Sequence, residues 1–158
     1  MDNSRSIFIK KTEEWTEHEV SFVSEVLEHT FANMLNGNEL NHEVSVLLTN
    51  DEEIRELNKK YRKIDKPTNV LSFSITSDTI VNELRMIGDI VISKEKISSE
   101  AKDQNKKFND HLAHIVIHGF LHLLNFTHDS KEDSTIMENK EVELLKMIDI
   151  SNPYGDRI

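Results

Sequence analysis

The chain has 158 residues, of which 37% are hydrophobic and 30% are charged, and its formal net charge at pH 7 is -10. This composition excludes a fibrous or disordered protein, and the length suits one domain with a hydrophobic core, which we expect to span residues 1–158. The negative charge argues against nucleic-acid binding over the whole surface. Because the sequence has no cysteine, disulfides and thiolate metal ligands are excluded.

Neither the first eleven residues nor any apolar run of the sequence predicts a targeting or membrane segment. Residues 1–11 lack an apolar signal core, and no run approaches the roughly 18 apolar residues that a membrane span requires. No internal repeat or Pro/Gly linker divides the sequence. We therefore expect a cytoplasmic protein that makes no membrane contact through a spanning segment.

The first half of the sequence predicts two strands, each followed by a helix. Apolar residues recur near helical spacing between Trp15 and Leu35. The sequence Thr49-Asn50-Asp51-Glu52 resembles a capping box that opens the second helix. The predicted strands are 6–10 and 44–49, and the predicted helices run from 15 to 35 and from the capping box at 49–52 to about 62. A loop is predicted from Lys63 to Thr68.

The second half predicts two more strands and three helices. Two β-rich runs, 69–75 and 88–92, are bounded by turn residues. The predicted helices run from Ser93 to about Lys107, from Asn109 or Asp110 to about Leu124, and from Ser130 to about Ile148. Strands early and helices late indicate an α+β fold, with a small mixed β-sheet of about four strands and helices packed on it.

Five cations lie within eight residues near the end of the second predicted helix. They are Lys59, Lys60, Arg62, Lys63 and Lys66. A helix C-terminus favours cations because of its dipole, so a solvated helix end explains the cluster by itself. A local basic patch that binds an anion is the alternative, and the cluster alone does not decide between them.

Histidines are concentrated in one segment. Five of the eight histidines fall within eighteen residues, at His111, His114, His118, His122 and His128. His118 and His122 are four residues apart, so on a helix their imidazoles stand on one face and can share a metal ion. Asn125 tolerates the left-handed conformation that ends a helix, which allows His128 to return to the metal.

The spacing of these three histidines matches the zinc motif H-E-x-x-H-x-x-G-x-x-H of the metzincin proteases. Gly119 stands where that motif has its glutamate base, so the protease machinery is absent. Three neutral imidazoles leave a coordination position open for water, as in catalytic zinc sites. The sequence therefore predicts one catalytic ion, zinc or another transition metal, bound by His118, His122 and His128 on a zincin-like helix.

The neighbouring histidines and acids allow several roles. His114 lies one turn before His118 and is either a ligand or a hydrogen-bond partner of one. We interpret His111 as a surface residue. If the metal is structural, a fourth ligand is required, and Asp129 is the candidate.

Four segments resemble the bacterial YbeY family. H-G-F-L-H-L-L-N-F-T-H at 118–128 is similar to its H-G-x-L-H-L-x-G-Y-D-H, and L-N-K-K-Y-R-K-I-D-K-P-T-N-V-L-S-F at 57–73 resembles L-N-x-x-Y-R-x-x-D-K-P-T-[DN]-V-L-S-F. G-D-I-V-I at 88–92 resembles its G-D-I-x-I strand, and Met137 and Glu141 fit its closing M-x-x-x-E. The matches follow the family's order.

Three positions depart from the family pattern. Asn125 replaces glycine, Phe126 replaces tyrosine and Thr127 replaces aspartate. The first is conformationally tolerable, and the second loses a hydroxyl group. If the family's aspartate orients a ligand or activates water, Thr127 leaves the protein either slower or reliant on Asp129.

The resemblance implies a zinc-dependent endoribonuclease, specific for single strands, that matures the 3′ end of small-subunit (16S) ribosomal RNA and acts in ribosome quality control. It implies single-stranded or ribosomal RNA and the ribosome or its small subunit as partners, and a catalytic Arg62 near the metal, together with His118. A guanidinium can hold a phosphate with two hydrogen bonds and offset developing charge. A surface salt bridge is the alternative role for Arg62.

Two other functions remain compatible with the sequence. One is a ribosome-assembly factor whose metal is mainly structural, which suits the acidic net charge. The other is a metal-dependent hydrolase of a different substrate, which shares the histidine spacing. The nucleophile, water or the RNA 2′-hydroxyl, and the oligomeric state are left open by the residues.

Overall fold

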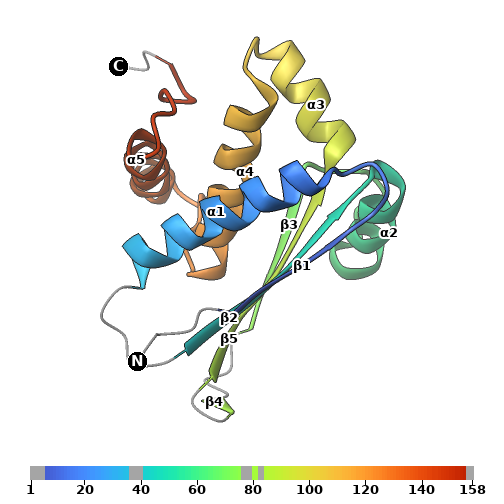
Figure 1. The fold of residues 1–158 in the computed structure, drawn as a ribbon, viewed down its shortest axis with the longest axis horizontal. Coiled ribbons are helices and arrows are strands. Elements are labelled where there is room, and N and C mark those ends of the chain that lie inside the picture. Colours follow the sequence, from blue (N-terminus) through green and yellow to red (C-terminus); the bar gives the residue numbers. More distant parts are fainter. Residues whose placement is uncertain (1–5, 36–40, 76–79, 82–83, 156–158) are drawn as a thin grey trace.

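The structure is a computed structural model that describes residues 6–35, 41–75, 80–81 and 84–155 (Figure 1). Its elements in chain order are β1 (Ser6–Lys11), α1 (Glu17–Met34), β2 (Asn41–Thr49), α2 (Asp51–Arg62), β3 (Val70–Ser74), β4 (Ile80–Val81), β5 (Leu84–Ser93), α3 (Lys94–Asp103), α4 (Phe108–Leu123) and α5 (Lys131–Lys146). The predicted α+β class is confirmed.

The strands form one mixed sheet in the order β1-β2-β5-β3, with the two-residue β4 also paired to β5. β1, β2 and β5 are parallel, whereas β3 and β4 run antiparallel to β5. The predicted mixed sheet of about four strands is therefore confirmed, and β4 is an addition. Strand β3 lies at the edge of the sheet and packs against α4, the helix that carries the histidines.

The two faces of the sheet are covered unequally. Alternate residues of a strand point to opposite faces, so Val46 and Leu48 of β2 join the large core under α1 and α4, while Leu47 points to the other face. On that face, Ile54 of α2 packs against Leu71 and Val91 in a small cluster. Figure 1 shows the sheet nearly edge-on, with α1 and α4 on one side of the strands and α2 on the other.

Helix α4 is the central element of the larger layer. It contacts α1, α3, α5, β3 and β5, and most of its residues are buried. Gly119 allows a close approach to the sheet, because a Cβ there would lie 3.1 Å from Val70 Cγ2 and 3.2 Å from Ile90 Cγ2. The Ser72 hydroxyl donates to the Gly119 carbonyl across this contact at 2.9 Å. The position where metzincins carry glutamate is thus a packing position here.

Several predicted helix ends shift by a few residues. Asn50, not Thr49, caps α2 by accepting a hydrogen bond from the Glu53 N–H. Helix α3 ends at Asp103 instead of Lys107, because Asn105 has a left-handed φ of 55° and the Lys106 N–H returns to the Ala101 carbonyl. Helix α4 then begins at Phe108, so Asn109 and Asp110 lie inside it and are not its cap.

Helix α5 begins where the sequence predicts, whereas α1 begins at Glu17, two residues after its predicted start. Ser130 caps α5 by accepting from the Asp133 N–H at 3.0 Å, as predicted. Thr16 and Glu19 form a reciprocal capping box at the start of α1. Within the described part of the chain, no helix is long and apolar enough to cross a membrane.

Candidate metal centre

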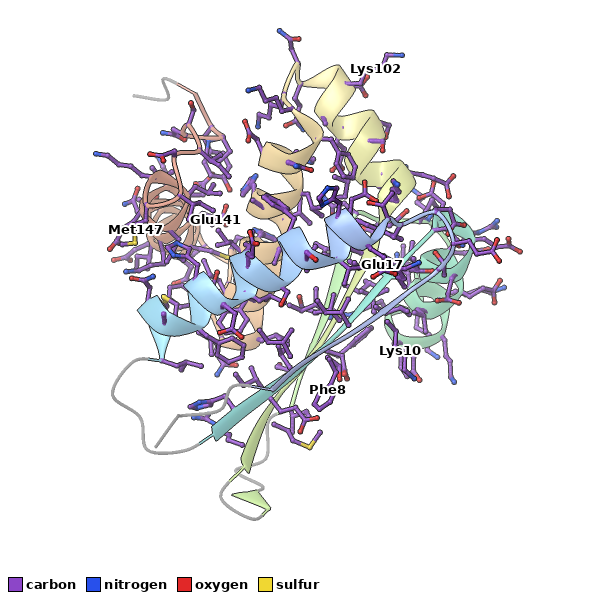
Figure 2. All side chains as sticks on the ribbon, viewed as in Figure 1. Phe8, Lys10, Glu17, Lys102, Glu141 and Met147 are labelled. Atoms are coloured by element: carbon purple, nitrogen blue, oxygen red, sulfur yellow. The ribbon has the colours of Figure 1, made fainter. Side chains whose placement is uncertain are left out.

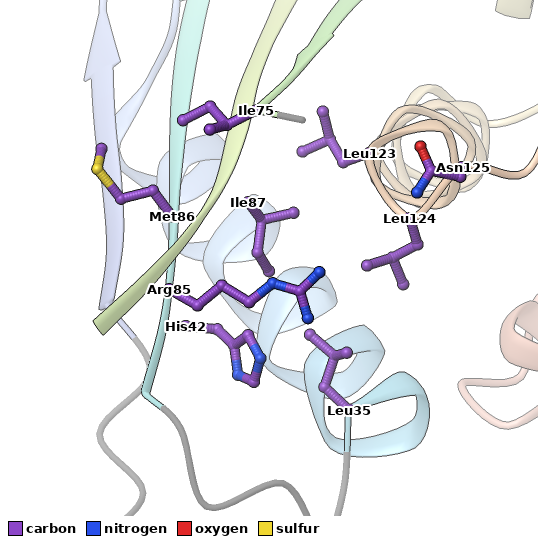
Figure 3. A pocket seen from close by; sticks show the side chains of 9 residues that line it. All are labelled: Leu35, His42, Ile75, Arg85, Met86, Ile87, Leu123, Leu124 and Asn125. Atoms are coloured by element: carbon purple, nitrogen blue, oxygen red, sulfur yellow. The ribbon is translucent and has the colours of Figure 1, made fainter. Parts of the chain in front are cut away.

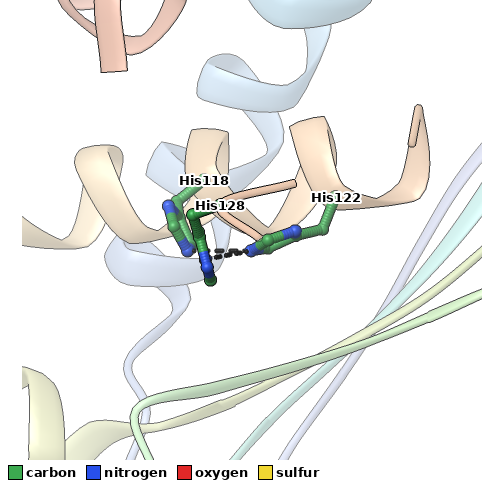
Figure 4. Close-up of side chains that lie close together, drawn as sticks. All are labelled: His118, His122 and His128. Carbon is green, nitrogen blue, oxygen red and sulfur yellow. Dashed lines mark hydrogen bonds between the residues drawn. The ribbon is translucent and has the colours of Figure 1, made fainter. Parts of the chain in front are cut away.

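Three imidazoles converge where α4 ends. His118 and His122 stand one turn apart on α4, and His128 comes from the loop before α5 (Figure 4). The His122 Nε2 atom lies 3.1 Å from His118 Nε2 and 3.0 Å from His128 Nε2. The structure therefore brings together all three predicted ligands, each through the same ring atom.

The turn after α4 brings back His128 and orients His122 at the same time. Asn125 adopts the predicted left-handed conformation, with φ of 71°. The Phe126 N–H then bonds the Leu121 carbonyl at 3.1 Å, which closes the helix end. His122 Nδ1–H donates to the Phe126 carbonyl at 2.9 Å. One tight turn thus fixes two of the three imidazoles.

A buried carboxylate orients the third imidazole. Glu141 of α5 has no exposed surface, and its Oε2 accepts a hydrogen bond from His118 Nδ1–H at 2.9 Å. Its Oε1 accepts from His114 Nε2–H at 2.6 Å and from the Tyr154 hydroxyl. Burial raises the pKa of Glu141, but the bonds from His114 and His118 outweigh it and lower that pKa to about 2. Glu141 is therefore an ionised acceptor that holds His118.

These hydrogen bonds decide which ring nitrogens can bind a metal. Because Nδ1 carries the proton in His118 and His122, Nε2 of each neutral ring presents a lone pair. Two such lone pairs at 3.1 Å repel unless a cation lies between them. Nitrogen ligands about 2.05 Å from a tetrahedral metal are roughly 3.3 Å apart, close to the separations here. The three Nε2 atoms fit one transition-metal ion.

A second cluster that could be mistaken for a metal site shares His118. His114, His118 and Glu141 also place potential ligand atoms within 4.8 Å of one another. Direct hydrogen bonds of 2.6 and 2.9 Å already join these groups and leave no room for an ion between them. The geometry favours His114 as a hydrogen-bond partner of Glu141, so it reaches the ligand His118 through that carboxylate and not directly.

Arg62 lies in the same cleft as the three histidines. The cleft is lined by Arg62, Asn69, Val70, Leu71, Ser72, Ser74, His118, His122, Asn125, Phe126, Thr127, His128 and Asp129. Arg62 Nη2–H donates to the Ser72 carbonyl at 2.7 Å, and its guanidinium lies 5.4 Å from the centre of the Phe73 ring. Since Ser72 also bonds Gly119 of α4, Arg62 is tied through β3 to the helix that carries the ligands.

The other cations of the basic cluster surround the end of α2. Lys59, Lys60, Lys63 and Lys66 are all exposed, and Lys63 ends the helix with a left-handed φ of 62°. The buried Asn58 side chain donates to the Lys66 carbonyl at 2.8 Å and holds the following loop. The lysines thus form an exposed helix end, as the first interpretation predicts, and only Arg62 of the cluster lines the cleft, so anion binding stays a prediction.

Two histidine environments differ from what the sequence suggested. Interpreting His111 as a surface residue was wrong, because it is 3% exposed and donates from Nε2 to Glu100 at 2.8 Å. The M-x-x-x-E match predicted no role for Glu141, and no sequence pattern pointed to Tyr154. A buried carboxylate facing two histidines is a contact between α4 and α5, so only the tertiary structure reveals it.

A separate hollow opens between the end of α4 and β5 (Figure 3). Leu123, Leu124, Ile87 and other apolar side chains line it, together with Arg85 and His42. Asn125 lines both this hollow and the histidine cleft, from the turn that separates them.

The chain is similar to known proteins over most of its length. The model of the family described as Endoribonuclease YbeY matches residues 7–149. The Endoribonuclease YbeY of Francisella tularensis subsp. tularensis (strain WY96-3418) is 44% identical over 117 residues, covering 71% of each chain. That of strain FSC 198 is 42% identical over 125 residues, covering 75% of this chain and 73% of the relative. The chain belongs to the YbeY family.

A solved structure shares the fold of this YbeY-family chain. The solution structure of TM1509 from Thermotoga maritima superposes with a TM-score of 0.59 at 30% identity, and the match covers 96% of both chains.

The three departures from the YbeY motif have distinct structural consequences. Asn125 supplies the left-handed turn. Phe126 contributes its backbone carbonyl to His122, an interaction that a ring hydroxyl does not affect. The Thr127 hydroxyl donates to Asp133 Oδ2 at 3.4 Å, in the first turn of α5. Asp129 is exposed and lines the cleft, but it is not in either of the ligand clusters found among the described residues.

Proposed function

We propose that this YbeY-family protein is a zinc-dependent endoribonuclease that cleaves single-stranded RNA. The observation that carries the proposal is the convergence of three imidazole Nε2 atoms in an open cleft that also contains Arg62. Two relatives that share most of their length with this chain are named endoribonucleases. Three imidazoles suit zinc, and the same donor set also accepts nickel, copper or iron.

His118, His122 and His128 would hold the ion, and Arg62 would hold the scissile phosphate. When bound, the ion would supply Lewis acidity and lower the pKa of a coordinated water. Arg62 uses one N–H for the Ser72 carbonyl, and its remaining donors suit a non-bridging phosphate oxygen. The Ser72 anchor reduces the entropy that Arg62 would lose on binding. Phosphodiester cleavage places extra charge on those oxygens, so a fixed guanidinium stabilises the transition state.

The proposed substrate is ribosomal RNA, with the 3′ end of the small-subunit (16S) RNA as its cleavage region and a further role in ribosome quality control. The family resemblance supports this assignment, and so does the charge distribution. The chain carries a net charge of -10, yet Arg62 lines the cleft and the exposed Lys59, Lys60 and Lys63 lie next to it at the end of α2. The acidic surface repels RNA, which disfavours binding of free RNA from solution. A ribosome, in contrast, can present a single strand directly to a small basic cleft. A cytoplasmic location belongs to the same proposal.

The acidic surface also favours a second candidate, a ribosome-assembly factor whose metal is structural. The two functions differ in what Arg62 does. In an assembly factor Arg62 affects binding alone, whereas in a nuclease it affects the rate of bond cleavage.

The deciding experiment is cleavage of an end-labelled single-stranded RNA by untagged protein, with Arg62→Ala and His122→Ala prepared identically. We expect Arg62→Ala to lower kcat by roughly 100-fold while keeping its metal, as loss of one donor to a developing anion does in other enzymes. His122→Ala and a chelator remove metal and activity together. The matched control is Lys102→Ala, an exposed cation on α3 far from the cleft (Figure 2).

The products also identify the nucleophile. A 2′,3′-cyclic phosphate end indicates attack by the 2′-hydroxyl, and cleavage of a DNA analogue indicates water. Equal residual cleavage by wild type and both variants indicates a contaminating nuclease and rejects the proposal, leaving the assembly factor and a hydrolase of a different substrate.

A further inference from the structure

The sheet face that α2 covers carries a row of side chains that the proposed cleavage reaction does not use. Phe8 of β1 is in register with Ser45 of β2, Ser45 with Asp89 of β5, and Asp89 with Phe73 of β3. The four side chains therefore form one line across the sheet, on the face opposite α1 and α4. Tyr61 of α2 packs edge-to-face on Phe73, with ring centres 5.4 Å apart.

These residues line a single hollow, which we call the aromatic groove. Its lining is Phe8, Lys10, Ser45, Val46, Leu47, Leu57, Tyr61, Phe73, Asp89, Ile90 and Val91. Phe8 and Tyr61 are each 56% exposed, although both are large apolar side chains. Phe8 and Phe73 stand three strand spacings apart, or about 14 Å. A groove with exposed aromatic walls and a polar floor is typical of a binding surface and not of a core.

Cations accompany each aromatic side chain of the groove. Lys10 follows Phe8 by two residues on the same face of β1, and Figure 2 shows both on the side of the strand away from α1. Lys60 Nζ lies 5.1 Å from the centre of the Tyr61 ring, and Arg62 lies 5.4 Å from that of Phe73. Paired aromatics and cations suit a ligand that alternates flat rings with phosphates, which is single-stranded nucleic acid.

Asp89 gives the floor of the groove a different chemistry from its rim. Its exposed carboxylate lies in register between Ser45 and Phe73. A carboxylate repels phosphate but accepts hydrogen bonds from the amino or imino groups of a base. Bases would therefore turn inward, and phosphates would follow the cations at the rim.

The groove is continuous with the metal centre around the edge of the sheet. β3 is an edge strand, and its neighbours Ser72 and Phe73 point to opposite faces. Arg62 touches both, because it bonds the Ser72 carbonyl in the metal cleft and lies over the Phe73 ring in the groove. A strand whose phosphate is held by Arg62 can thus continue directly onto the aromatic groove.

We propose that the aromatic groove binds the bases of single-stranded RNA next to the phosphodiester held at the metal centre, by stacking on Phe8, Tyr61 and Phe73. The proposal rests on the endoribonuclease function proposed above. It makes the groove a second binding region, which would select unpaired RNA because only unpaired bases expose their faces for stacking.

The test compares Phe8→Ala, Phe8→Leu and Phe8→Trp in the full-length, metal-loaded protein. Binding of a fluorescent, fully 2′-O-methylated 12-nucleotide RNA is followed by anisotropy, and cleavage of the unmodified RNA is followed in parallel. We expect Phe8→Ala and Phe8→Leu to weaken binding roughly 5- to 100-fold and to raise KM, and Phe8→Trp to retain both, because stacking requires an aromatic ring. The control is Ile136→Ala, a 55% exposed apolar residue on α5.

The outcomes separate this proposal from the one it rests on. If wild type cleaves RNA and all three Phe8 variants bind and cleave like it, the groove is not an RNA site, although the nuclease stands. If wild type binds but does not cleave, and Phe8→Ala weakens binding, the nuclease fails and the groove stands. If Phe8→Ala instead converts a dimer to a monomer in light scattering without changing RNA binding, the groove is an interface between copies, and the proposal is overturned.

Discussion

At the scale of single residues, the chemistry of the metal centre depends on proton positions that neighbouring groups impose. Glu141 and the Phe126 carbonyl each accept from an Nδ1–H, and this directs the Nε2 lone pairs of His118 and His122 to a common point. Without those acceptors each imidazole could adopt either tautomer and rotate. The ligands therefore depend on groups that never touch the metal.

Replacing Glu141 with glutamine tests this dependence. Glutamine has the same shape, but its amide loses the negative charge and offers one acceptor oxygen to three donors. We expect Glu141→Gln to lower metal affinity roughly 10- to 100-fold, measured by competition with a chromophoric chelator. Glu143→Gln on the exposed side of α5 is the control, since Glu143 accepts a hydrogen bond from Lys140 at the surface and lies outside the histidine cluster. Equal affinities for Glu141→Gln and wild type would contradict a positioning role.

At the scale of elements, the site requires α4, β3 and β5 to approach one another closely. Gly119 removes a side chain between α4 and β3, and Gly88 does so between β5 and β3. Gly88 has φ of 151°, and a Cβ there would lie 2.3 Å from the Phe73 carbonyl oxygen. Because Phe73 adjoins Ser72, the residue that anchors Arg62, the packing at Gly88 also sets the position of the cleft.

We expect Gly88→Ala to lower the free energy of unfolding by about 3 kcal/mol, since the new methyl group meets backbone and the conformation is strained for any L side chain. Gly155→Ala is the matched control. It also has positive φ, 66°, but a Cβ there meets nothing within 4 Å, so it should cost about 1 kcal/mol. Chemical denaturation of both variants gives the difference, and equal losses would show that backbone strain alone matters at Gly88.

At the scale of the whole molecule, the buried His111 makes the free energy of unfolding depend on pH. Burial lowers the pKa of His111 from its ordinary value of 6.5, although its bond to Glu100 opposes the shift. His111 Nδ1 is buried and has no hydrogen-bond partner among the described residues, so a proton there would be unsatisfied. The unfolded chain therefore binds this proton more tightly than the folded chain does.

Stability of the metal-free protein should consequently fall as the pH drops below about 6.5, because the unfolded state gains the proton first. We expect His111→Gln to make this decline shallower between pH 6.5 and 5, measured as the free energy of unfolding by denaturant titration. His18→Gln, which changes an exposed histidine of α1, is the control. An unchanged slope in His111→Gln would assign the decline to other groups.

Features formed by residues close together in the chain were predictable from the amino-acid sequence. The i, i+4 pair His118 and His122, the left-handed Asn125 and the returning His128 lie within eleven residues, so helix geometry and one turn place them. The same local rules predicted the α+β class and most elements to within a few residues. They failed at α3 and α4, where the caps that the sequence offered were not the ones used.

Features that depend on contacts between distant segments of the chain became visible in the three-dimensional structure alone. The strand order, the approach of Arg62 to the histidines, the burial of His111 and the bonds from His114 and His118 to Glu141 all join residues far apart in the chain. The physical reason is that strand pairing and side-chain burial are fixed by how much apolar surface the whole chain removes from water, a quantity that no single segment contains.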